Sequence, residues 1–180
     1  MSWQVSARTC RAGERLLNRL SVMSITVLQE HPEFRLGHVG SVFVTVWFSE
    51  LSHAALDALT NHQKLIFEKH GRVTMVSVVV NATQAPGPEL RERLKKEMAQ
   101  LADVRMGNIT VVLTRGMSAI IARSFLAMLS LISKEHMKVL KTLEEAADEV
   151  KRIPGQHAAT LANLTLAEDL VAFAALPRPK

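Results

Sequence analysis

The segment VVVNATQAPGPELRERL, residues 78–94, contains the end of one element, a turn and the start of another. It begins inside VTMVSVVV at 73–80, a β-branched run that predicts a buried strand of a parallel sheet. Pro88 then stands at the first turn of a predicted helix with Leu90 and Leu94 on one face. Open α/β sheets place ligand and switch residues at such carboxyl ends of strands, so this turn is a candidate site.

The chain on either side predicts an alternation of strands and helices. HPEFRLGHVGSVFVTVWF, residues 31–48, forms a hairpin in which Gly40 supplies the positive φ angle of a tight turn. Both faces of its second run are largely apolar, so that strand is central or covered on both sides. Further elements follow along the chain: helices at 52–71, 88–102, 117–132 and 142–153, and strands at 73–80, 108–113 and 136–140.

From residue 34 to 153 the predicted order is therefore β-β-α-β-α-β-α-β-α. The fold class is α/β, with a mixed sheet made of an N-terminal hairpin and then alternating strands and helices, followed by a C-terminal helical tail. We expect three segments: a basic arm at 1–22, an α/β domain at 23–153, and a linker with a short helix at 154–180. The arm is interpreted as disordered or as an extension from an early start site.

Charge and cysteine content exclude several function classes. The formal net charge of the 180 residues is +5, but residues 1–22 carry a net +3 of it, and the body is too nearly neutral for nucleic-acid binding. Cys10 is the only cysteine, which rules out an internal disulfide and fits a reducing compartment, so we expect a cytoplasmic, bacterial protein. Arg123 and the short length of the apolar helix at 117–132 argue against a membrane span.

The order of elements resembles the STAS domain family, the anti-sigma-factor antagonist type of fold. The resemblance covers residues 33–153 and is carried by the opening FRLGHVGSVFVTVWF and by the closing HMKVLKTLEEAADEV, a short strand followed by a capped helix. It implies a regulatory module that binds protein partners. In switchable members, the loop after the third strand carries an Asp-Ser-Ser-Gly motif whose serine is phosphorylated at a helix N-terminus.

That phosphorylation motif is absent here. The matching loop runs from Asn81 to Pro88, and its only hydroxyl belongs to Thr83, several residues before the helix that would hold a phosphate. We therefore expect a binding role that does not depend on the serine switch.

Polar residues gather after two strands of the predicted sheet, and we interpret them as a partner or anion site. If the two strands are neighbours, an arginine and a helix N-terminus face the loop after residue 80. The rival interpretation is an exposed arginine beside ordinary turn residues. The candidate residues are Asn81, Thr83, Thr114, Arg115, Gly116 and Ser118.

The helix at 117–132 is apolar on more than one face, which predicts either burial in the core or an interface or ligand groove. The groove residues are Ile121, Phe125, Met128, Leu129 and Ile132. We hypothesise that the tail forms a helix at 166–175, started by a Thr165-x-x-Glu168 capping box, and folds back to cover this segment.

Catalytic and metal chemistry find no support in the sequence. It contains no G-x-S-x-G, P-loop or G-x-G-x-x-G motif, and the pairs His31/His38 and His62/His70 lack the i, i+4 spacing of helical metal ligands. We expect no catalytic residues, no metal and no cofactor. The sequence predicts a non-enzymatic protein-interaction or regulatory module. Its partner is either another protein or a second copy of the chain in a homodimer. The alternative is a carrier of a small apolar or lipid-like ligand.

Overall fold

The computed structural model describes residues 24–81, 84–133 and 137–180. Its strands form one mixed sheet in sequence order, in which β1, β2 and β3 pair antiparallel and β3, β4, β5 and β6 pair parallel. The strands are β1 (Thr26–His31), β2 (Phe34–Val39), β3 (Val42–Trp47), β4 (Val73–Val79), β5 (Arg105–Val112) and β6 (Met137–Leu140). The α/β class with a hairpin and a mixed sheet is confirmed, and β1 adds a strand before the predicted hairpin.

The hairpin β2–β3 turns at Gly40, whose φ of 54° lies in the left-handed region that glycine adopts without strain. Strand β3 lies between β2 and β4, as its two apolar faces predict. Val44 and Val46 point to one face of the sheet and Phe43 to the other, and all three are fully buried.

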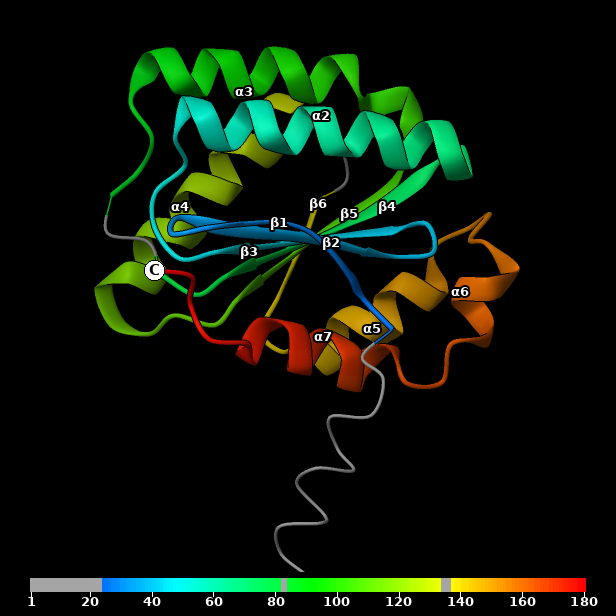
Figure 1. Cartoon of the computed structure of the whole chain (residues 1–180). Helices are drawn as coiled ribbons and strands as arrows, with labels where there is room; N and C mark the ends of the chain where they lie inside the picture. Colours follow the sequence, from blue (N-terminus) through cyan, green and yellow to red (C-terminus); the bar gives the residue numbers. More distant parts are fainter. Residues whose placement is uncertain (1–23, 82–83, 134–136) are drawn as a thin grey trace, which may run out of the picture.

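Three crossover helices cover one face of the sheet (Figure 1): α2 (His53–His70), α3 (Pro88–Gln100) and α4 (Gly116–Ser133). Ser52 caps α2 by accepting a hydrogen bond from the Ala55 amide, and Gly71 ends it. A short 3-10 helix, Ala102–Val104, leads from α3 into β5. Because the parallel strands follow one another in sequence order, crossovers of one hand place all three helices on the same face.

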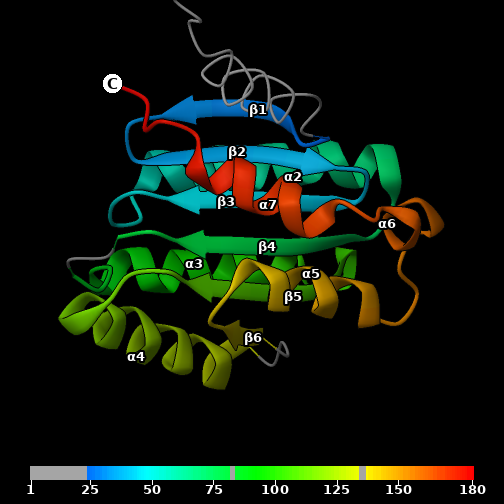
Figure 2. The same cartoon turned by 90° about the horizontal axis from the view of Figure 1, so that it is seen from below.

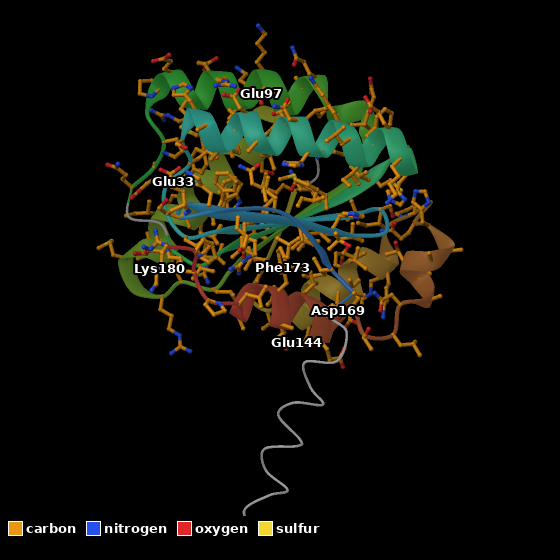
Figure 3. All side chains as sticks on the ribbon, viewed as in Figure 1. Glu33, Glu97, Glu144, Asp169, Phe173 and Lys180 are labelled. Carbon is orange, nitrogen blue, oxygen red and sulfur yellow. The ribbon has the colours of Figure 1, made fainter. Side chains whose placement is uncertain are left out.

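The opposite face carries α5 (Leu143–Arg152), α6 (Ala158–Ala162) and α7 (Leu166–Ala175), as Figures 1 and 2 show. The capping box at Thr142 and Glu145 forms as predicted. Figure 3 places Asp169 and Phe173 beneath the sheet, on the side opposite Glu97 of α3.

The tail forms the predicted helix, but it does not cover α4, and that hypothesis is wrong. Leu166, Leu170 and Phe173 are fully buried against the sheet valines and α5, on the face that α4 does not touch. The physical reason is that α2, α3 and α4 already occupy the other face, whereas α5 alone is too short to cover this one. The second capping box is also not formed, because Thr165 has φ −99° and ψ 11° instead of the extended conformation of an N-cap. Its hydroxyl accepts no hydrogen bond from the first turn of α7 and shares its hydrogen between Asn163 and Asp169.

Arg35 fastens α7 to the sheet. Its side chain is 1% exposed, and its Nε donates to Glu30 Oε1 at 2.8 Å. Its Nη1 donates to the carbonyl oxygens of Phe173 and Leu176 at the C-terminal end of α7, where a cation is favourable. The guanidinium also lies 5.8 Å from the centre of the Phe173 ring.

We expect truncation of Phe173 to destabilise the whole domain, because its ring fills the space between β2 and α7. Phe173→Ala should lower the free energy of unfolding by about 3–5 kcal/mol. Chemical denaturation measures this value, and Val171→Ala on the same helix is the control because Val171 is 41% exposed. Equal effects of the two substitutions would contradict the placement of α7.

Candidate functional site

A pocket of about 140 Å³ lies between the sheet and the three crossover helices. Its walls are mainly apolar and come from the second half of the sheet and from all three helices: Trp47 and Met75 from the strands, Leu59 from α2, Leu94 and Met98 from α3, and Phe125 and Leu129 from α4. The opposite face of the sheet, filled by α5 and α7, contains none of these side chains.

A row of hydroxyl groups crosses the sheet on the pocket side. Thr45, Ser77 and Thr110 are in register on the adjacent strands β3, β4 and β5. The Thr45 hydroxyl donates to the Ser77 hydroxyl at 3.1 Å, and Ser77 and Thr110 line the pocket. The row therefore gives an apolar pocket a polar strip on its floor.

Two charged side chains line the pocket, Glu50 at its border and Arg105 in its wall. Arg105, at the start of β5, is 8% exposed, and its Nη2 donates to Gln63 Oε1 of α2 at 3.1 Å. Gln63 in turn donates to the sulfur of Met75 at 3.8 Å. This cation is thus held by a neighbouring helix and is part of the wall.

The loop after β4, which lies within the segment 78–94, borders the pocket. Asn81 is exposed and lines the pocket together with Gln84, Ala85 and Pro86. Ser49, Glu50 and Leu51 of the β3–α2 connection line it as well. Both connections follow the carboxyl ends of parallel strands, the usual place of ligand sites in such sheets.

The predicted anion site is only partly assembled. Strands β4 and β5 are neighbours, so the loops that carry Asn81 and Arg115 leave the same edge of the sheet. Arg115 is exposed, and within residues 24–81, 84–133 and 137–180 its side chain has no hydrogen bond or ion pair. The other residues after β5, Thr114, Gly116 and Ser118, do not line the pocket, and Thr83 lies outside the described residues. The anion site stays a prediction.

The predicted apolar groove coincides in part with the pocket. Ile121, Phe125 and Leu129 line the pocket. Met128 does not, and its sulfur accepts a hydrogen bond from Arg91 of α3. The side chain of Ile132 lies outside the described part of the structure. Sequence reasoning missed Ser77, Thr110 and Arg105, and the single signal for the first two was their position between apolar residues in two buried strands.

Searches against known families, curated proteins and solved structures find no match. Among the described residues, no helix combines the length and the apolar character that crossing a bilayer requires. Nor do the described histidines, cysteines and carboxylates gather in a group of three that could hold a metal ion.

The environment of His70 predicts how stability depends on pH. Burial, with the charge of Lys69 and the nearby His38 and His157, lowers the pKa of His70 below its ordinary value of 6.5. The folded state then binds fewer protons than the unfolded state, so the free energy of unfolding falls as the pH drops below about 6.5 through the lowered pKa. Burial lowers the pKa of His62 too, with the same sign.

We therefore expect the melting temperature to fall between about pH 7.5 and about pH 5.5, and His70→Gln to reduce that fall because glutamine does not titrate there. Thermal melts of both proteins across this range measure the effect. An identical pH dependence in the variant would show that His70 does not contribute.

Proposed function

We propose that this chain is a non-enzymatic regulatory module of STAS-like type, and that its signal is a small apolar molecule bound in the pocket. The observation that supports this most is the position of the pocket. It lies beneath the loop after β4, which is the third strand of the order predicted from residue 34. This is the loop in which the STAS family carries its phosphorylated serine. Since this loop lacks the Asp-Ser-Ser-Gly motif, a bound ligand replaces phosphorylation as the input in our proposal.

The size of the pocket sets the size of the ligand. Its volume of about 140 Å³ is close to that of an engineered apolar cavity of ~150 Å³ that binds benzene. A single aromatic ring or a short acyl chain therefore fits, and because the pocket is open to solvent on one side, a larger dye can insert one of its rings. Burying six carbon atoms contributes roughly 5 kcal/mol before the entropy lost on association is subtracted, which corresponds to weak and reversible binding.

A second candidate function is protein association through α4, and exposed apolar residues favour it. Met117 is 71% exposed and Ile120 is 58% exposed, and both lie on the first two turns of the helix. Arg115 stands just before them and adds a charge that an acidic partner or a second copy of the chain could meet. This surface is separate from the pocket, so ligand binding and partner binding can coexist.

Filling part of the pocket should weaken ligand binding. Ala122 lines the pocket on α4 and is 6% exposed. Ala122→Met should weaken binding of the fluorescent apolar dye N-phenyl-1-naphthylamine by about tenfold, ~1.4 kcal/mol, because the longer side chain occupies the space. Fluorescence titration measures the dissociation constant of the dye. All variants carry Trp3→Phe, so that Trp47, which lines the pocket, is the one tryptophan whose emission reports on binding.

Ala127→Met is the matched control, because Ala127 is exposed on the same helix. We expect it to bind the dye as the parent protein does. Equal dye binding by the Ala122 and Ala127 variants would place the dye outside the pocket and remove the main support for this function.

If α4 mediates self-association, introducing charge into its exposed face should disrupt it. The double substitution Met117→Lys and Ile120→Lys should shift a dimer to a monomer while the melting temperature stays within about 2 °C, since both side chains are exposed. Sedimentation velocity measures the oligomeric state. A parent protein that is monomeric at all concentrations, or a dimer that persists in the variant, would exclude α4 as a homodimer surface.

A further inference from the structure

The hydroxyl row on the pocket floor indicates which polar group the ligand carries. We propose that the ligand is a small apolar molecule with one uncharged carbonyl group, whose oxygen accepts hydrogen bonds from the hydroxyls of Ser77 and Thr110. This inference rests on the proposed function, because it specifies the chemistry of the molecule that the same pocket binds.

The first support is that these hydroxyls have hydrogens left to donate. Thr110 is 2% exposed and lines the pocket, yet its side chain makes no hydrogen bond to any residue that the structure describes. Ser77 is 7% exposed, and its oxygen accepts from Thr45, so its own hydrogen remains for a partner in the pocket. Hydroxyl groups this deeply buried normally have partners, which a ligand can supply.

The second support is the spacing of the two donors. Ser77 and Thr110 are direct partners in the parallel pairing of β4 and β5. Neighbouring strands lie about 4.8 Å apart, and a hydroxyl reaches an acceptor oxygen at about 2.7–2.8 Å. One oxygen placed between the two side chains can therefore accept from both. A carbonyl oxygen, with two lone pairs, has the matching geometry.

The charges around the pocket favour a neutral group over a carboxylate. The two proposed donors are uncharged, and Glu50 on the pocket lining would repel an anion. The Arg105 guanidinium in the wall already donates to Gln63. A buried carboxylate would need charged partners of its own, whereas a ketone, ester or amide needs hydrogen-bond donors alone.

Acetophenone and ethylbenzene test this inference, because they have nearly the same shape and only the first has a carbonyl oxygen. Both are measured by displacement of N-phenyl-1-naphthylamine from the parent protein and from two variants. Thr110→Val removes the hydroxyl at nearly constant volume, and removing an unpartnered hydroxyl should not destabilise the fold. Thr110→Ser keeps the hydroxyl and is the rescue control.

We expect Thr110→Val to weaken acetophenone relative to ethylbenzene by about tenfold, and Thr110→Ser to leave that ratio within about twofold of the parent value. Benzoate should bind more weakly than acetophenone to the parent protein. If the ratio is the same in all three proteins, or if benzoate binds more tightly, the pocket binds apolar molecules without the proposed carbonyl contact and this inference fails alone. If the dye and both compounds fail to bind, the proposed function fails with it.

Discussion

The handedness of the crossover connections is the constraint on which the rest of this structure depends. Strands β3 to β6 follow one another across the sheet in sequence order, and each connection crosses over with the same hand. All three crossover helices must then lie on one face (Figure 1). The other face is left to elements that come after the last strand, which are α5, α6 and α7. The recruitment of the C-terminal tail into the core follows from this constraint.

The two faces consequently differ in how they are packed. On the α7 face, Phe173 fits so closely over Gly37 that a Cβ there would lie 2.7 Å from the ring, and Arg35 and Asp169 add buried polar contacts. On the α2–α4 face, the side chains of Ser77 and Thr110 are too small to fill the space between the sheet and the helices, and the pocket lies there. One face thus stabilises the domain while the other offers the space for a ligand.

Local patterns predicted much of this fold, because the features involved are local. The alternation at 42–48, the cap at Ser52 and the capping box at Thr142 each depend on residues a few positions apart, and each was confirmed. Strand β5 begins at Arg105, three residues before the predicted start, because Arg105 and Gly107 hide the β-branched pattern. The apolar periodicity of residues 166–175 predicts a helix but does not predict which face of the sheet α7 covers, since that depends on strand order. The hydroxyl row was equally hidden, because Ser77 and Thr110 are 33 positions apart and meet through strand register.

We propose that a small apolar molecule binds in the space beneath α4 and not on the exposed face of that helix. Methionine methyl groups report on both places, since Met75, Met98 and Met137 line the pocket and Met117 is exposed outside it. NMR spectra of the protein labelled with ¹³C at the methionine methyls, titrated with N-phenyl-1-naphthylamine, therefore test this proposal directly. We expect shifts of the methyl resonances of Met75, Met98 and Met137, with that of Met117 unchanged. Shifts confined to Met117, or no shift at any methionine, would contradict the proposal.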